Sequence, residues 1–202
     1  MLIIIHRVNK IVDLENIPKN FGVEIDVRAF GNKLVLNHEP YESGDLLDDY
    51  LKKYNHSFII FNIKEAGIEK RVIELAKKYR VEEYFLLDVE PYWIHHATND
   101  GFKKIAIRYS ENEPIEMALK YKKKADWLWI DIPTKLPISP KTIKQMKGYK
   151  TCLVCPERWG RPSEILKYIN NIKKLKFNLD AVMTSLKHSG DWQNLLDYYN
   201  KV

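Results

Sequence analysis

The chain has 202 residues, of which 45% are hydrophobic, 30% charged and 12% aromatic, a composition that excludes global disorder. This length predicts a single domain, residues 1–202, with a substantial core. No run approaches the roughly 20 apolar residues of a membrane span. The apolar run at 2–5 is too short for a signal peptide and has no basic segment before it. We therefore expect a cytoplasmic protein without a membrane span.

The net charge of +6 comes from lysines in pairs and triplets beside the predicted helices. A nucleic-acid surface gathers basic residues on one face together with stacking aromatic rings. Because that pattern is missing, we expect a solvated outer face and no nucleic-acid partner. The two cysteines, Cys152 and Cys155, lie in a β-rich run rather than at a helix N-terminus, where the pKa of a thiol falls. This position predicts buried structural thiols.

Apolar runs alternate with helical patterns from one end of the chain to the other. The strands are expected, in chain order, at 2–5, 23–27, 33–36, 58–63, 84–89, 104–108, 127–132, 151–155 and 179–183. The helices are expected at 68–79, from Pro91 onward, and at 113–121, 140–147, 162–175 and 191–199. Gly31-Asn32 predicts a turn that joins 33–36 to the second strand as a hairpin.

Eight principal strands with helices between them indicate an α/β fold, a small (β/α)8 TIM barrel. The run Phe58 to Phe61 is apolar at every position, which is typical of a parallel sheet covered on both faces. An open doubly wound sheet would need a glycine-rich turn after its first strand, and no glycine precedes Gly22.

Active sites of TIM barrels are built at the carboxyl ends of the strands. The polar residues at the expected strand ends therefore form one candidate site. The first three principal strands and the hairpin supply His6, Arg7, Glu24, Asp26, His38, Asn62 and Lys64. Later strands supply possible supporting residues, namely Asp88, Glu90, Arg108, Asp131 and Glu157. The amino ends show no comparable set, an asymmetry that favours an enzyme.

Glu24 and Asp26 are two residues apart on one strand, so their side chains project from the same face. Two carboxylates this close need a counter-charge, or one of them stays protonated. Either a divalent cation or the pair Arg7 and Lys64 meets that need. The alternative to a metal site is an internal salt-bridge network.

Five stretches in this order resemble the glycerophosphodiester phosphodiesterase family, which belongs to the barrels of the phosphatidylinositol phospholipase C type. These stretches are His6-Arg7, Glu24-Ile25-Asp26-Val27, Val35-Leu36-Asn37-His38-Glu39, Phe61-Asn62-Ile63-Lys64 and Asp180-Ala181-Val182-Met183-Thr184. The resemblance covers nearly the whole chain and is strongest over residues 1–65.

The resemblance implies a metal-dependent phosphodiesterase that acts on a small glycerol- or sugar-linked phosphodiester. His6 and His38 would be the general acid/base pair. Glu24, Asp26 and Asn62 would hold Ca²⁺ or Mg²⁺, which take oxygen ligands. The substrate phosphate would be bound by Arg7 and Lys64.

The sequence departs from the family pattern at several positions. Asn62 stands where the family has a third metal-binding carboxylate, and Val8 stands where a glycine follows His-Arg. The loop after the first strand and the stretch between His38 and Asn62 are both short. These changes keep the histidine pair while they alter the pocket.

Two other functions are consistent with the residues. A catalytically degenerate barrel would bind a phosphorylated ligand without hydrolysing it, which Asn62 and the short loops favour. An isomerase or aldolase would use Lys64 as a Schiff-base nucleophile. That chemistry needs a lowered lysine pKa, whereas the neighbouring carboxylates Glu24 and Asp26 raise it.

Overall fold

The computed structural model describes residues 1–199 of the chain. It divides into two compact units, one formed by Ile4–Asp100 and the other by Met1–Ile3 with Gly101–Val202. We refer to them as the N-terminal unit and the C-terminal unit. Each is described separately.

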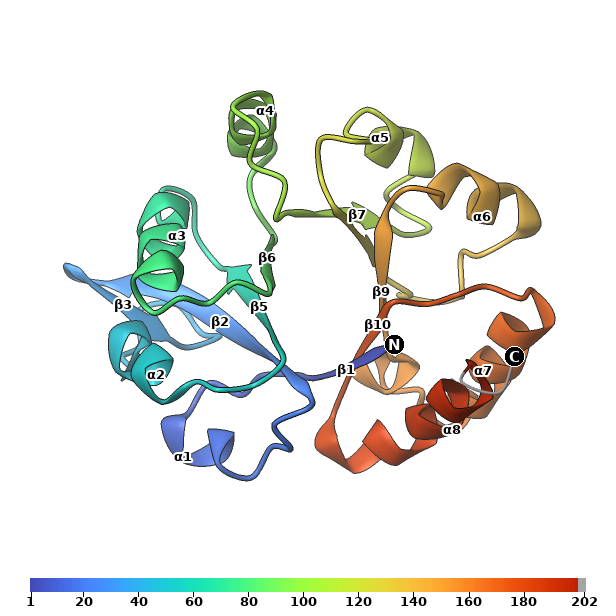
Figure 1. The fold of residues 1–202 in the computed structure, drawn as a ribbon, viewed down its shortest axis with the longest axis horizontal. Helices are drawn as coiled ribbons and strands as arrows, with labels where there is room; N and C mark the ends of the chain where they lie inside the picture. The colour runs from blue at the N-terminus through green and yellow to red at the C-terminus, as the bar shows by residue number, and fades with distance from the viewer. Residues whose placement is uncertain (200–202) are drawn as a thin grey trace. The chain divides into compact units, whose positions relative to one another are not determined.

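The N-terminal unit is built around β2, which pairs in parallel with β1 on one side and β5 on the other, while β6 pairs in parallel with β5. Helices α2 and α3 pack against each other beside these strands (Figure 1). The elements are β1 (Leu2–Ile5), α1 (Ile11–Leu14), β2 (Gly22–Phe30), β3 (Lys33–Leu36), β4 (Asp45–Leu46), α2 (Leu47–Lys53), β5 (Phe58–Ile63), α3 (Glu69–Lys78), β6 (Tyr84–Leu87) and α4 (Pro91–Asn99).

Strand β2 is longer than the expected strand at 23–27 because its second half forms a hairpin. From Val27 to Phe30 it pairs antiparallel with β3, and Gly31 and Asn32 form the connecting turn. Gly31 has φ of 57°, in the left-handed region that glycine adopts without a Cβ penalty. The predicted turn is confirmed. The hairpin carries the chain beyond the parallel strands and returns it to His38.

The C-terminal unit contains four parallel strands in the order β7-β8-β9-β10. Figure 1 shows α7 and α8 side by side, and the two helices are in contact. The elements are β7 (Ala106–Tyr109), α5 (Ile115–Leu119), β8 (Trp127–Ile130), α6 (Pro140–Met146), β9 (Lys150–Val154), η1 (Pro156–Trp159), η2 (Pro162–Glu164), α7 (Ile165–Lys174), β10 (Ala181–Thr184), η3 (Leu186–His188) and α8 (Ser189–Tyr199).

The described residues therefore contain eight parallel strands, as the sequence predicts. Seven of these strands lie entirely or almost entirely in the core, and β5 and β6 have every residue buried. Ser139 caps α6, since its hydroxyl accepts a hydrogen bond from the backbone N–H of Thr142. The short elements α1, β4 and α2 were not expected from the pattern. No helix within residues 1–199 is long and apolar enough to cross a membrane.

Candidate active site

The neighbouring strands β2 and β5 bring the two predicted acidic residues, Glu24 and Asp26, next to Asn62. In the register of β2 and β5, Asp26 stands opposite Asn62, and Glu24 stands opposite Ile60. Glu24 and Asp26 are fully buried, and Asn62 is 7% exposed. Buried polar groups this close to one another need hydrogen bonds or counter-charges.

Glu24 is held by three neighbours. The side-chain amide of Asn62 donates to Oε1 over 2.8 Å, and the backbone N–H of Arg7 donates to Oε2 over 2.8 Å. The Nε2 atom of His6 lies 3.9 Å from Oε2. Burial and the neighbouring Asp26 nevertheless raise the pKa of Glu24 to about 7. These neighbours alone therefore leave Glu24 partly protonated at neutral pH.

Asp26 is surrounded by two cations and one amide. Lys64 Nζ lies 3.2 Å from Oδ1, and Arg7 Nε lies 3.7 Å from Oδ2. Asn9 donates from Nδ2 to Oδ2 over 2.9 Å, and the backbone N–H of Asp26 donates to Asn9 Oδ1 over 2.8 Å. The ion pair with Lys64 does not have hydrogen-bond geometry, so Oδ1 is buried without a hydrogen-bond partner. Lys64 also reaches Asp88 over 3.8 Å.

Asn9 is a site residue that the sequence analysis missed. It follows the first strand by four residues, in a loop with no motif of its own. Only its two reciprocal hydrogen bonds with Asp26 show its role. They fix both the backbone and the carboxylate of Asp26, which sets the direction of the carboxylate.

His38 lies beyond the hairpin with its side chain 37% exposed. Its Nδ1 is 2.6 Å from Glu39 Oε1. Arg28 fixes the loop, because its guanidinium donates from Nε and Nη2 to the His38 carbonyl over 3.1 and 2.9 Å. The His38 side chain lowers the pKa of Glu39, and Arg7 adds to that effect. Arg7 thus interacts electrostatically with both Glu39 and Asp26.

The oxygens of this cluster suit a hard divalent cation. Among residues 1–199, Asp26 Oδ1 and Asn62 Oδ1 are buried and accept no hydrogen bond. Carboxylate and amide oxygens are ligands for Ca²⁺ and Mg²⁺. No group of three or more His, Cys, Asp or Glu residues in that part of the chain has a metal-binding arrangement. A site with Glu24 and Asp26 therefore depends on the amide oxygen of Asn62.

The other expected supporting residues occupy different environments. Glu90 precedes α4 and is exposed, whereas Asp88 pairs with Lys64. In the C-terminal unit, Asp131 accepts from Arg108 Nη1 over 2.7 Å and from Trp159 Nε1 over 2.9 Å. Glu157 accepts from the backbone of Ser185 over 2.8 Å, at the end of β10. Four of the five expected supporting residues thus form a hydrogen bond or an ion pair, namely Asp88, Arg108, Asp131 and Glu157. The fifth, Glu90, is exposed at the start of α4.

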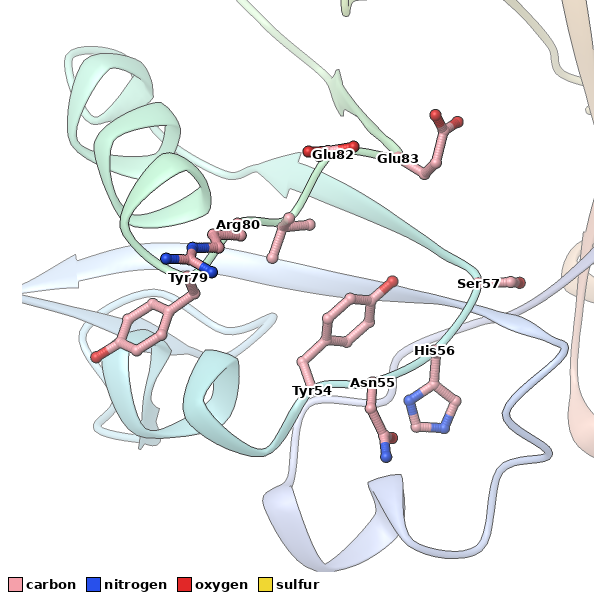
Figure 2. Close-up of a pocket in the computed structure, with 9 residues that line it drawn as sticks. Tyr54, Asn55, His56, Ser57, Tyr79, Arg80, Glu82 and Glu83 are labelled. Carbon is pink, nitrogen blue, oxygen red and sulfur yellow. The ribbon is translucent and has the colours of Figure 1, made fainter.

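A pocket of about 340 Å³ in the N-terminal unit lies away from this cluster (Figure 2). It is lined by residues 54–57 and 79–83, which precede β5 and β6. Asn62 and Lys64 lie at the other end of β5, and the pocket is therefore separate from the candidate active site. In Figure 2 the Tyr54 ring points into this pocket, while the His56 ring points away from it.

No protein-family model matches the sequence, and no curated protein matches it either. Solved structures, in contrast, match the structure of this chain. A protein from Agrobacterium tumefaciens assigned as a glycerophosphoryl diester phosphodiesterase matches with a TM-score of 0.69 and 10% identity, over 99% of both chains. A glycerophosphoryl diester phosphodiesterase from Parabacteroides distasonis matches with a TM-score of 0.67 and 13% identity, over 96% of this chain and 86% of the other.

The chain has the fold of the glycerophosphoryl diester phosphodiesterases. The predicted (β/α)8 TIM-barrel fold and the family resemblance are thereby confirmed at the level of structure. The identity of 10–13% shows the fold alone. The roles of His6, His38 and the other site residues stay predictions, as do the divalent cation and the single-domain organisation.

Proposed function

We propose that the protein is a metal-dependent phosphoric diester hydrolase that acts on a glycerophosphodiester or a similar small phosphodiester. The observation that carries this proposal is the buried pair of Glu24 and Asp26, with Lys64 and Arg7 beside it. The strands place two carboxylates and two cations together at one end of the sheet. The phosphodiesterase fold supports the assignment.

In this proposal Glu24, Asp26 and Asn62 hold a Ca²⁺ or Mg²⁺ ion. When bound, the ion supplies positive charge for a phosphoryl oxygen and lowers the pKa of an attacking hydroxyl. Asn9 orients Asp26 through its two hydrogen bonds. Arg7 and Lys64 bind the phosphate, Arg7 through a planar fork of N–H donors and Lys64 as a point charge.

His6 and His38 move the protons. His6 is nearly buried, with its Nε2 near Glu24, and a nearby carboxylate stabilises a protonated imidazole. His38 pairs with Glu39 through Nδ1, which fixes the ring and leaves proton transfer to Nε2. Proton transfer by a positioned side chain contributes roughly 10²- to 10⁴-fold to a rate. Loss of either histidine is therefore expected to lower kcat by at least about 100-fold.

The test is hydrolysis of glycerophosphoethanolamine and of bis(p-nitrophenyl) phosphate, with and without chelator, by the wild-type protein and by His6→Ala, His38→Ala and Asp26→Ala. We expect each variant and the chelator to lower turnover by at least about 100-fold, and Mg²⁺ or Ca²⁺ to restore it only in the wild type. The matched control is His96→Ala, at an exposed histidine on α4, which is expected to keep full activity. Undiminished turnover by either active-site histidine variant would contradict the proposal.

A second candidate is a barrel that binds a phosphorylated ligand and does not hydrolyse it. One observation favours this candidate. The Asn62 amide donates a hydrogen bond to Glu24, and this bond supplies part of the electrostatic stabilisation that a cation would give the carboxylate. Calorimetric titration separates the two functions. Divalent-ion binding that Asp26→Ala abolishes supports the hydrolase, whereas metal-independent binding of a phosphodiester without turnover supports the binding protein.

The same proposal places the activity in the cytoplasm. Cys152 and Cys155 are buried thiols outside any disulfide, and reduced thiols are typical of proteins in reducing compartments. In this proposal the substrate is a small molecule, and the protein has no nucleic-acid partner.

A further inference from the structure

Arg28 connects the two loops of the N-terminal unit that carry His38 and Lys64. Its guanidinium donates from Nε and Nη2 to the His38 carbonyl over 3.1 and 2.9 Å. It also donates from Nη1 to the Lys64 carbonyl over 3.3 Å. One side chain therefore binds the backbone of two predicted site residues that are far apart in the sequence.

The place of Arg28 on β2 explains why it reaches both loops. At Val27, β2 has Leu36 of β3 on one side and Ile63 of β5 on the other. Leu36 and Ile63 are the last residues of those two strands. Arg28 follows Val27 directly, so its guanidinium lies where the chains leave the strands. A planar fork of N–H donors can bind carbonyl groups of both loops at once.

Glu65 adds a second connection between β2 and the loop after β5. Its Oε1 accepts a hydrogen bond from the backbone N–H of Ala29, and its Oε2 lies 4.0 Å from Arg28 Nη1. The carboxylate thus ties its loop to the backbone of β2 and also supplies a counter-charge for the guanidinium. Such a counter-charge is needed because the Arg28 side chain is only 15% exposed.

These contacts separate the role of Arg28 from that of Arg7. The Arg28 guanidinium gives its hydrogen bonds to two backbone carbonyls and pairs with a carboxylate of the protein. The Arg7 side chain is 42% exposed and lies beside Asp26. Arg7 is therefore the better placed of the two arginines to bind a phosphate, whereas Arg28 acts on the backbone of the neighbouring loops.

We propose that Arg28 is a positioning residue that holds the loops of His38 and Lys64 at a fixed separation and supports turnover through His38. A catalytic group has to be held within about 0.5 Å of its productive position. A misplacement of about 1 Å lowers a rate by roughly 100-fold. The role in turnover rests on the proposed hydrolase function, but the connection between the loops does not.

The kinetic test uses Arg28→Lys, which keeps the positive charge but has no planar fork to bridge two carbonyls. We expect kcat for bis(p-nitrophenyl) phosphate to fall about 10- to 100-fold with KM unchanged. In His38→Ala the same change should lower kcat no further, because residues that act as a unit are not additive.

Three kinetic results would overturn the proposal. Unchanged kcat in Arg28→Lys would show that the fork is not needed. A higher KM with wild-type kcat would show that Arg28 binds the substrate directly. A full further loss of kcat when Arg28→Lys is added to His38→Ala would show that Arg28 does not act through His38.

Arg71→Lys is the matched control for these measurements. Arg71 also donates to a backbone carbonyl of the β2–β3 hairpin, that of Asn32 over 2.7 Å, but it does so at the turn and is itself exposed. We expect Arg71→Lys to keep the wild-type kcat and KM. An equal loss of kcat in Arg71→Lys would mean that any loosening of the hairpin slows turnover, which would also overturn the proposal.

Amide hydrogen exchange tests the connection between the loops without turnover. The backbone N–H of Glu39 donates to Asn37 Oδ1, and that of Lys64 donates to the Val27 carbonyl. In Arg28→Lys we expect both amides to lose protection, while the amides inside β5 keep theirs. In Arg71→Lys we expect all of them to exchange as in the wild type.

The exchange measurement also separates this proposal from the hydrolase proposal. If the wild type hydrolyses no diester, loss of protection at Glu39 and Lys64 alone still supports the role of Arg28 in holding the loops. Unchanged protection at these two amides rejects that role even if the wild type is an active hydrolase. Loss of protection throughout β5 as well would show a general loss of stability and would reject it too.

Discussion

Asn62 donates a hydrogen bond from its side-chain amide to Glu24 Oε1 over 2.8 Å, and both groups are buried. The amide stabilises the ionised form of Glu24 and partly offsets the effect of burial on its pKa. The other end of the amide, Oδ1, accepts no hydrogen bond in the described residues. One side chain thus donates to Glu24 through its nitrogen and keeps its oxygen available for a cation.

The substitution Asn62→Asp tests this double role, because the two side chains have the same shape. We expect it to raise the affinity for Ca²⁺ or Mg²⁺ by about tenfold or more, since the charge of the ligands sets affinity for hard cations. Without metal we expect a lower Tm, because three buried carboxylates then repel one another. Calorimetric titration and thermal unfolding with and without the ion measure both effects.

The control for this change is Asn55→Asp, which adds the same charge at an exposed position just before β5. It should change neither the ion affinity nor the dependence of the Tm on metal. Unchanged ion affinity in Asn62→Asp, or a higher Tm without metal, would contradict the assigned role of Asn62.

Asn9→Ala tests whether Asp26 needs its amide partner. The change removes both reciprocal hydrogen bonds and leaves the buried N–H of Asp26 unsatisfied. A buried group left without its partner costs about 1–3 kcal/mol in the free energy of unfolding. We also expect ion affinity to fall about 10- to 100-fold, as when an outer partner of a metal ligand is lost.

Urea unfolding and calorimetric titration of Asn9→Ala check these two effects. The control is Asn20→Ala, in the exposed loop before β2, which should match the wild type. Wild-type ion affinity in Asn9→Ala would mean that its contacts with Asp26 do not orient the carboxylate.

The sequence predicted the eight parallel strands because their apolar runs are nearly continuous, as in Phe58 to Phe61. It also placed Glu24 and Asp26 on one face, which follows from the two-residue period of a strand. It missed α1, which has four residues, and α2, whose helix spans seven. Such short helices show too little periodicity to stand out and are stabilised by packing instead.

Asn9 was missed for a different reason. It lies in a loop and acts through one partner far away in sequence, Asp26. Its role depends on which strands are adjacent, which a local pattern does not encode. Asn62 was identified by its place in a strand, but its donation to Glu24 became evident only from the register of β2 and β5.

The cysteines should be unreactive in the folded protein. Cys152 and Cys155 are fully buried, and burial raises the pKa of the Cys155 thiol although Trp192 Nε1 donates to its sulfur over 3.2 Å. The thiolate is the reactive form. We expect no reaction of the native protein with an aromatic disulfide reagent at pH 8, and reaction of both thiols in denaturant.

Ser43→Cys provides the reference for that experiment, since residue 43 is exposed. Its added thiol should react with the reagent at once, while Cys152 and Cys155 should remain unreacted. Rapid reaction of the wild-type protein under native conditions would show that the C-x-x-C segment is open to solvent.

His56 should make the folded protein sensitive to mild acid. Its residue is 8% exposed, its Nε2 pairs with the Ile17 carbonyl over 3.1 Å, and its Nδ1 is buried without a hydrogen-bond partner. Burial lowers the pKa of this imidazole below its usual 6.5. The unfolded chain therefore binds this proton more tightly than the folded chain does. The stability that comes from neutral His56 is complete above pH 6.5 and is lost as the pH falls toward the lowered pKa.

Urea unfolding at pH 7.5 and pH 5.5 measures this loss in the wild type and in His56→Gln, which cannot titrate in this range. We expect the free energy of unfolding to fall more on acidification in the wild type than in the variant. His96→Gln, which removes an exposed histidine and leaves His56 in place, should keep the full wild-type loss. An equal fall in all three proteins would mean that the buried imidazole is protonated in the folded state as readily as in the unfolded chain.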